Sequence, residues 1–395
     1  MRNRVLGLVY QNESDALTFA SIGYCAALNA SGYAAQVIDL NHPQGVKDLG
    51  DALLSGDVAF GFGLQGVGSR LTTLSSGINL WTATKVPFIC LHHDHPCHNP
   101  FNHSSSSPYV ANRYYFESFL NAKKRYLPSD QLSEVVPLTF LGIPHQSQIP
   151  FKERTFRFIY AKSGRSLDEE NAELANLPKK LRDGVSEQLK RAQKSPNLNL
   201  CELVEDVFAD IGIDHNQSHQ QFWSVVKLMD LYVRRKRAID MVEWLKLQEG
   251  ALIIGDGWDF IDKASARADF KPTMNFAECV PLYQQTQFFL NTNPYGRDVL
   301  HERVINGLAY ESCVITDTNA WWDQNFSDIP GLFKFNWDQP LEDQLRPVLD
   351  KADSMADAAA ANRSVALERF PPSGIGPLLS FVDRVFAFVN TKHSD

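Results

Sequence analysis

The chain has 395 residues, 44% of them hydrophobic, and a formal net charge of −8 at pH 7. This length exceeds what one hydrophobic core usually serves, so we expect two domains, and the apolar content excludes a disordered chain. The acidic balance argues against binding to nucleic acid or to a membrane surface. No run approaches the roughly 18 apolar residues that a membrane-spanning helix needs, and the sequence starts directly on a strand-like run. We therefore expect a cytoplasmic protein without a membrane span.

The six cysteines are scattered along the chain and form no Cys-x-x-Cys pair. Several lie in apolar runs, such as Cys90 in VPFICL and Cys313 in SCVIT. This pattern is typical of small buried side chains in a reducing compartment and not of a disulfide framework.

Short apolar strand patterns alternate with helical stretches over the first part of the chain. The strand patterns cover residues 5–10, 34–40, 57–63, 86–93 and 137–144. Alternation of this kind is typical of a parallel sheet with helical crossover connections. We therefore predict an N-terminal Rossmann-like domain over residues 1–150.

The same alternation returns further along the chain. Strand patterns cover residues 156–164, 250–257, 287–293 and 312–317. A charged stretch from about 167 to 248 shows apolar residues at helical spacing and no strand pattern. We predict a second Rossmann-like domain over residues 151–375 that contains this all-helical elaboration, and a terminal helix over 376–395 that can pack back on the first domain. We interpret the basic run RRKR (234–237) as a solvated helix face.

The segment GFGLQGVG at residues 61–68 matches the Gly-x-Gly-x-x-Gly pattern at Gly61, Gly63 and Gly66. In dinucleotide-binding enzymes these glycines let backbone amides approach a diphosphate at the start of a helix. Here the pattern follows the third predicted strand instead of the first, and no acidic residue ends a strand about 20 residues later. We therefore favour a glycine-rich loop that lines an interdomain cleft over a dehydrogenase site.

Residues 92–103 (HHDHPCHNPFNH) contain five histidines and follow a predicted strand, where ligands bind in open α/β sheets. One hypothesis is metal ligation by a set of six side chains: His92, His93, Asp94, His95, Cys97 and His98. Another is general-base chemistry by Asp94 with His93 or His95, because a His–Asp pair can titrate near neutral pH. The third alternative is that these side chains only make the loop polar and have no chemical role. The spacing fits no established zinc pattern, so we favour the base and predict no metal.

A strand pattern ending at Asn293 is followed by a Pro/Gly loop and by a predicted helix over 299–310. His301, Arg303 and Asn306 recur near the start of that helix and can converge on a ligand at its positive end. The arginine suits a diphosphate, because a guanidinium makes paired, charge-assisted hydrogen bonds to phosphate oxygens. The alternative is that the arginine and the preceding glutamate only form surface ion pairs.

At these residues the sequence resembles the second domain of glycosyltransferases of the GT-B type, especially bacterial CgeB-like and family-4-like enzymes. The family pattern, a helix of the type R-V-F-E-A-L-A-C-G followed by a V-I-T-D strand, corresponds to residues 303–311 and 314–317. The preceding segment 278–291 resembles the family's short helix and asparagine-terminated strand. In the first domain, FICLHHDHP (88–96) resembles the strand-then-D-H-P element of some bacterial members.

The resemblance implies two Rossmann-like domains that face a cleft, with the donor mainly on the second domain and the acceptor on the first. It places Lys162 and Arg165, in the loop after the first strand of the second domain, against the donor phosphates. The other donor-binding candidates are Asn293, His301, Arg303 and Asn306. Relatives stabilise the leaving diphosphate with such side chains and a helix dipole, so the resemblance implies no obligatory metal or other cofactor.

Two positions depart from the family pattern. Asn306 stands where relatives have the glutamate that holds the ribose hydroxyls of the donor, and Glu311 stands where they have a glycine. An asparagine can still hydrogen-bond a hydroxyl, but it carries no charge. These departures keep open a non-catalytic protein that binds a sugar or a partner on the same scaffold.

The sequence therefore predicts a glycosyltransferase that moves a sugar from a nucleotide-sugar donor to a hydroxyl or amide of a protein or glycan acceptor. Asp94, with His93 or His95, would act as the base or orient the acceptor. Lys162, Arg165 and Arg303 would neutralise the departing phosphates. The alternatives are a metal-dependent hydrolase built on the loop 92–103 and the non-catalytic binding protein.

Overall fold

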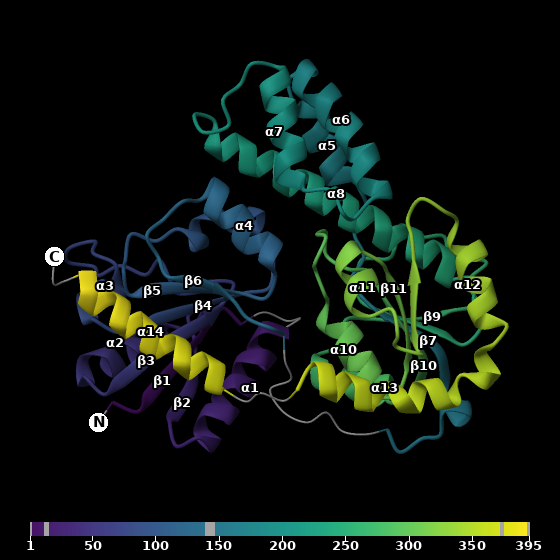
Figure 1. The fold of residues 1–395 in the computed structure, drawn as a ribbon, viewed down its shortest axis with the longest axis horizontal. Coiled ribbons are helices and arrows are strands. Elements are labelled where there is room, and N and C mark those ends of the chain that lie inside the picture. Colours follow the sequence, from purple (N-terminus) through teal and green to yellow (C-terminus); the bar gives the residue numbers. More distant parts are fainter. Residues whose placement is uncertain (1, 12–15, 139–146, 372–374, 393–395) are drawn as a thin grey trace. The chain divides into compact units, whose positions relative to one another are not determined.

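The structure is a computed structural model and describes residues 2–11, 16–138, 147–371 and 375–392. Two compact units divide the chain: residues 1–143 with 370–395 form the first, and residues 144–369 form the second. Each unit contains a six-stranded parallel sheet with helical crossover connections (Figure 1). None of the described helices is both long enough and apolar enough to cross a membrane.

The sheet of the first unit has the strand order β2-β1-β3-β4-β5-β6. Its strands are β1 (Arg4–Val9), β2 (Ala34–Asp39), β3 (Val58–Leu64), β4 (Phe88–His92), β5 (Val110–Tyr114) and β6 (Ser133–Val135). Its helices are α1 (Ala16–Ala30), α2 (Pro43–Ser55), α3 (Leu80–Thr84), α4 (Glu117–Tyr126) and α14 (Gly376–Lys392), with 3₁₀ turns η1 (Pro96–His98) and η2 (Pro100–His103). Strands are added on opposite sides of β1, so the carboxyl ends of β1 and β3 flank a topological switch point.

The C-terminal helix α14 contributes to the core of the first unit. Phe381, Val385 and Val389 are buried in one cluster with the strand residues Leu6 and Phe88. Figure 1 shows α14, in yellow, lying along the first sheet. The helix therefore covers apolar surface that the first 143 residues alone would leave open.

The sheet of the second unit has the strand order β12-β11-β10-β7-β8-β9. Its strands are β7 (Phe156–Ala161), β8 (Ala251–Ile254), β9 (Asp269–Lys271), β10 (Thr286–Asn291), β11 (Cys313–Asp317) and β12 (Leu332–Phe335). Around it lie α9 (Phe276–Tyr283), α10 (Glu302–Ala309), α11 (Ala320–Asn325), α12 (Leu341–Leu349) and α13 (Ala356–Arg369), with η3 (Phe151–Glu153) and η4 (Ala352–Ser354). Here the switch point lies between β7 and β10.

Four helices replace the single crossover helix expected between β7 and β8. They are α5 (Asp168–Asn176), α6 (Lys179–Lys194), α7 (Leu200–Asp210) and α8 (His219–Leu245). The long helix α8 buries Phe222 and Met229 near its start and Met241 near its end. Close to that end, Trp244 Nε1 donates to Glu342 Oε2 of α12 at 2.8 Å. The predicted all-helical elaboration is therefore confirmed.

Most predicted strands are confirmed, and the exceptions are short or polar. Residues 137 and 138 belong to no strand, and the rest of the predicted strand 137–144 lies outside the described residues. Four strands, β5, β6, β9 and β12, are absent from the sequence-based prediction. In β5 the apolar run is interrupted by Asn112 and Arg113, yet both are buried. Their polarity is compensated by His92 Nε2, 2.9 Å from Asn112 Oδ1, and by Glu134, 3.0 Å from Arg113 Nε.

The interpretation of the run 234–237 as a solvated helix face is wrong. Arg237 is only 2% exposed, and its guanidinium lies 3.6 Å from the carboxylate of Asp317 at the end of β11. Arg235 is also largely covered and forms ion pairs with Glu169 and Glu170 of α5. The basic run therefore packs against other parts of the second unit. Charged residues alone do not reveal this, because their partners are distant in sequence.

All six cysteines are buried and unpaired by disulfides, as predicted. Burial raises the pKa of the thiols of Cys90 and Cys313 to about 12. These side chains are therefore protonated and act as small apolar groups.

Candidate functional site

The carboxyl ends of β7 and β10 meet at the switch point of the second sheet, where Lys162 and Thr292 lie. Lys162 Nζ donates to Thr292 Oγ1 at 3.2 Å, and the Tyr160 hydroxyl lies 2.8 Å from the same oxygen. Burial lowers the pKa of Lys162 well below its ordinary value, and the positive charges of Arg303 and Arg234 lower it further. A bound anion would relieve the repulsion among these cations, so this edge of the sheet is suited to an anionic ligand.

Arg303 is held in this cluster at the start of α10. Its side chain is 7% exposed, and Nη1 donates to the Ala161 carbonyl at 2.6 Å. His301, the N-cap residue of α10, has its Nε2 2.9 Å from Arg303 Nη2. Its Nδ1 accepts from the Arg303 backbone N–H at 3.2 Å and from Arg303 Nε at 3.1 Å, and it lies 2.8 Å from the Glu302 carboxylate. Burial and then the charge of Arg303 lower the pKa of His301 to about 4, so the ring is neutral at pH 7. Arg303 is thus a buried residue and does not form only surface ion pairs.

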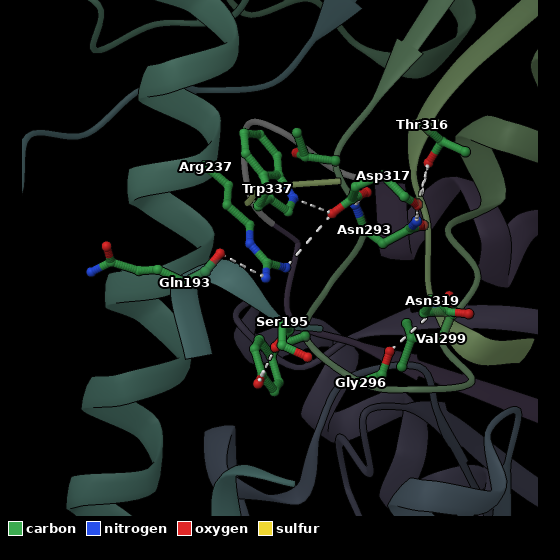
Figure 2. A network of polar contacts seen from close by, with 12 residues as sticks. Gln193, Ser195, Arg237, Asn293, Gly296, Val299, Thr316, Asp317, Asn319 and Trp337 are labelled. Carbon is green, nitrogen blue, oxygen red and sulfur yellow. Dashed lines mark hydrogen bonds and ion pairs between the residues drawn. The ribbon is translucent and has the colours of Figure 1, made fainter. Parts of the chain in front are cut away.

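Asn293 connects the ends of β10 and β11 to the start of α10. Its backbone N–H donates to Asp317 Oδ1 at 2.7 Å, and its Nδ2 donates to Thr316 Oγ1 at 3.0 Å (Figure 2). Its Oδ1 accepts from the backbone N–H of His301 at 3.3 Å and from Asn291 Nδ2 at 2.9 Å. Since both ends of the amide are engaged inside the protein, Asn293 orients the start of α10.

The remaining donor-side candidates, Arg165 and Asn306, have no hydrogen bond to this cluster in the described part of the chain. The Arg165 side chain is 68% exposed, and its Nη1 lies 3.9 Å from the Glu169 carboxylate. Asn306 lies about one helical turn beyond Arg303 in α10 and is half-buried. Among the described residues no hydrogen-bonding partner of its amide is found, so the amide can turn toward a ligand.

Glu311, where the family pattern has glycine, occupies a backbone position that favours glycine. Its φ is 59°, in the left-handed region, just after α10. The Ser312 N–H donates to the Gly307 carbonyl at 3.0 Å, and the Glu311 N–H donates to the Leu308 carbonyl at 3.1 Å. These two bonds define a Schellman-type helix end. The helix therefore ends in the geometry that the glycine of the family pattern would favour, although Glu311 is strained in this conformation.

In the first unit, the glycine-rich loop and the histidine-rich loop are joined through Gln65 and Asp94. Gln65 Nε2 donates to Asp94 Oδ2 at 3.0 Å, and the Asp94 N–H donates to Gln65 Oε1 at 3.3 Å. Gln65 has a left-handed φ of 54°, and its carbonyl accepts from Asn102 Nδ2 at 2.9 Å. Bonds to both backbone and side chain hold this strained residue, so the carboxylate of Asp94 has a defined orientation.

The glycines of the Gly-x-Gly-x-x-Gly pattern allow close packing of this loop. A Cβ atom at Gly63 would lie 2.1 Å from the Val67 carbonyl oxygen, and one at Gly61 would lie 2.9 Å from the Trp81 ring. Gly61 and Gly63 lie within β3, the third strand, and only Gly66 lies in the turn that follows it, so the pattern overlaps the strand instead of following it. These close contacts explain the glycines without a dinucleotide.

Two of the five clustered histidines form a buried aromatic stack with Tyr114. The ring centroid of His92 lies 3.9 Å from that of His103 and 4.9 Å from that of Tyr114. His92 Nε2 lies 2.9 Å from Asn112 Oδ1, and His103 Nδ1 lies 2.8 Å from the Tyr114 hydroxyl. Burial lowers the pKa of His92 to about 4 and that of His103 well below its ordinary value. Both rings are therefore neutral parts of the core.

The other side chains of the predicted metal-binding set are also engaged by protein groups. The His93 ring stacks on Tyr115 with centroids 4.1 Å apart, and His95 Nδ1 accepts from the Cys97 N–H at 3.2 Å. Within the described part of the first unit by itself, no three His, Cys, Asp or Glu side chains come close enough to share one ion. The loop 92–103 therefore has no preformed metal site within this unit.

Several residues of these clusters are absent from the sequence-based prediction of the site. Thr292 and Asp317 lie at the carboxyl ends of predicted strands, so their position alone could have identified them. Gln65 carries no such signal, because a glutamine inside a glycine pattern is unremarkable in sequence. Arg234 and Arg237 belong to a basic run whose buried side the sequence does not show.

No family model and no curated protein sequence matches the chain. Solved structures match it nearly end to end. HepE from Anabaena in complex with UDP has a TM-score of 0.52 at 10% identity, covering 95% of this chain and 98% of HepE. The complex of HepE with UDP and glucose has a TM-score of 0.50 at 11% identity, with 95% and 98% covered. Sucrose-phosphate synthase from Thermosynechococcus elongatus has a TM-score of 0.50 at 10% identity, with 98% and 100% covered.

These likenesses concern the fold. Together with the two six-stranded parallel sheets, they confirm the predicted class: two Rossmann-like domains of the GT-B type, with a helical elaboration in the second.

Proposed function

We propose that the protein is a glycosyltransferase that takes a sugar from a nucleotide-activated donor. The observation that carries this proposal is the pair of Lys162 and Arg303 at the switch point of the second sheet, where Arg303 is 7% exposed and donates to the Ala161 carbonyl, next to Lys162. Preorganised cations of this kind compensate the charge that develops on a diphosphate as the sugar leaves. HepE, which shares the fold, has been solved in complex with UDP and glucose, so uridine diphosphate sugars are the first donors to test.

On the donor side, Lys162 and Arg303 neutralise the diphosphate as its bond to the anomeric carbon breaks. The start of α10 adds the positive end of the helix dipole. His301 accepts from Arg303 and keeps its guanidinium in place. Asn306 meets the ribose hydroxyls through its uncharged amide, and the exposed Arg165 serves as an outer phosphate contact. Asn293, whose amide is bonded within the protein, acts by positioning α10.

On the acceptor side, we assign the catalytic base to Asp94 in the first unit. A hydroxyl oxygen or an amide nitrogen of the acceptor attacks the anomeric carbon, its proton passes to the Asp94 carboxylate, and the electron pair of the broken bond leaves with the diphosphate. His93 or His95 orients the acceptor, which we take to be a protein or a glycan. The scheme requires no metal or other cofactor. The CgeB-like subtype, and with it a bacterial context, rests on the motif at 303–311.

Replacing Arg303 by alanine tests the central assignment. We expect turnover, measured as UDP released from UDP-sugars, to fall by about 100-fold or more, because a preorganised charge at the leaving group is lost. Arg346→Ala is the matched control, since Arg346 lies on α12 with a 67% exposed side chain that pairs with Glu342. Circular dichroism establishes that both variants are folded. Equal turnover of the Arg303 variant and the control would remove this assignment.

A non-catalytic binding protein is the second candidate, and Asn306 is the observation that favours it. Without the carboxylate that relatives place there, the donor can be held yet not turned over. This candidate predicts saturable binding of a nucleotide-sugar, measured by calorimetry, with no UDP release in the presence of protein or glycan acceptors.

A further inference from the structure

A buried arginine joins the helical elaboration to the carboxyl edge of the second sheet. Arg237 Nη2, on α8, donates to the carbonyls of Ala192 at 3.1 Å and Gln193 at 3.3 Å, at the end of α6. Its Nη1 lies 3.6 Å from Asp317 Oδ2 (Figure 2). The rings of Tyr295 and Trp337 lie 5.4 and 5.5 Å from the guanidinium carbon. The guanidinium is thus enclosed by a carboxylate and two aromatic rings.

The carboxylate that Arg237 faces also controls the start of α10. Asp317 Oδ2 accepts from Trp337 Nε1 at 2.9 Å, and Oδ1 accepts from the Asn293 N–H at 2.7 Å. Asn293 Oδ1 in turn accepts from the His301 N–H at 3.3 Å. An unbroken series of polar contacts therefore runs from α8 to the N-cap residue of α10.

The loop 293–301, which leads into α10, is also bonded on two further sides. The Tyr295 hydroxyl donates to the Ser195 carbonyl, just after α6, at 2.7 Å. Asn319 Nδ2 donates to the carbonyls of Gly296 at 3.3 Å and Val299 at 3.0 Å (Figure 2). The loop is held by the helical elaboration on one side and by the β11–α11 connection on the other.

The ion pair of Arg237 and Asp317 is better suited to positioning neighbouring groups than to stabilising the fold. Nε and Nη1 of Arg237 are buried and have no hydrogen-bonding partner among the described residues. A buried pair that is incompletely hydrogen-bonded adds little stability compared with apolar side chains of the same size. Removing one partner, however, leaves the other charge buried and uncompensated. Loss of Arg237 would therefore act on Asp317 and, through it, on Asn293.

We propose that Arg237 is a positioning residue of the donor site, through which the helical elaboration fixes the loop 293–301 and the start of α10. This inference rests on the proposed function, because it takes the start of α10 as the phosphate-binding end. It assigns the elaboration a role in forming the donor site.

The test compares Arg237→Met with Arg235→Met in the full-length protein. Arg235 is on the same helix and loses ion pairs to Glu169 and Glu170, but these lie within the elaboration. We expect Arg237→Met to weaken UDP binding by about tenfold or more, and Arg235→Met to change it by less than about twofold, in calorimetry. Hydrogen exchange of the amides of 293–301 should accelerate only in the Arg237 variant.

Two further variants separate positioning from general destabilisation. Adding Asp317→Asn to Arg237→Met removes the uncompensated charge while an oxygen remains to accept from the Asn293 N–H. We expect this double variant to recover part of the lost UDP affinity, because the new amide nitrogen cannot accept from Trp337 Nε1. If Arg237→Met does not fold, Tyr295→Phe, which loses only the hydroxyl bonded to Ser195, should still accelerate exchange in the loop.

Unchanged exchange over 293–301 in both Arg237→Met and Tyr295→Phe would overturn the inference. Equal loss of UDP affinity in the Arg235 control would also overturn it, because a general effect of the elaboration would then suffice. Accelerated exchange in a protein whose wild type binds no nucleoside diphosphate would instead support the anchoring of the loop and refute the proposed function.

Discussion

At the residue scale, two buried histidines make the stability of the first unit depend on pH. In the folded state burial lowers the pKa of His92 to about 4 and that of His103 well below its ordinary value. In the unfolded chain both take up protons as the pH falls below about 6.5. The unfolded state then binds more protons than the folded state, so stability is complete above about pH 6.5 and falls as the pH approaches 4.

The expected loss between pH 7 and 4.5 is on the order of 2 kcal/mol from His92 alone. His92→Gln removes the titrating ring and keeps an N–H donor for Asn112. This variant should be less stable at pH 7, because the stack with His103 is lost, but its stability should fall less on acidification. Urea unfolding at several pH values measures the difference. Parallel curves for the two proteins would contradict this account.

Only some residues of the candidate site can be predicted from their position in the sequence. Lys162, Asn293 and Arg303 follow strand ends or begin a helix, and this position is visible in sequence. The role of Arg237 is not, because its burial depends on Asp317 and Tyr295, which other elements bring to it. A basic run predicts charge but not which of its members faces inward.

At the element scale, Glu311 offers a direct test of how α10 ends. A non-glycine residue in the left-handed region costs about 1–2 kcal/mol, whereas glycine adopts it freely but loses more entropy on folding. We expect Glu311→Gly to stabilise the second unit by about 0.5–1 kcal/mol, or about 2 °C in its unfolding temperature.

Glu311→Ala is the control for that prediction. It also removes the carboxylate, which lies near Arg154, but keeps a Cβ atom at φ 59°. Differential scanning calorimetry should therefore show a gain for glycine and none for alanine. Equal stabilities of the two variants would show that the backbone at this position is not strained.

The period of the hydrophobic pattern predicts those helices and strands whose buried residues are themselves apolar. The apolar strands β1 and β7 and the helices α5 to α8 are of this kind. The strand β5 is different, because Asn112 and Arg113 are buried only through partners on neighbouring elements. Tertiary contacts, not local propensity, decide such elements.

At the scale of the whole molecule, the chain leaves the first unit after residue 143 and returns to it at residue 370. The core of the first unit therefore depends on packing of α14, which is distant in sequence from its other elements. Phe381 is the side chain of α14 that is most suited to test this dependence. It is fully buried, and the guanidinium of Arg113 lies 5.4 Å from its ring.

Phe381→Ala should destabilise the first unit by about 3–5 kcal/mol, because a large buried ring is replaced by a cavity. Phe386→Ala, on the same helix but only half-buried, should cost clearly less. Scanning calorimetry can assign the affected unit, since UDP at 100 times its Kd should stabilise the donor-binding unit by about 2.7 kcal/mol. If the proposed donor site is correct, UDP raises one transition and Phe381→Ala lowers the other. If both perturbations act on a single transition, the two units unfold together, and the stability of the donor site depends on the C-terminal helix.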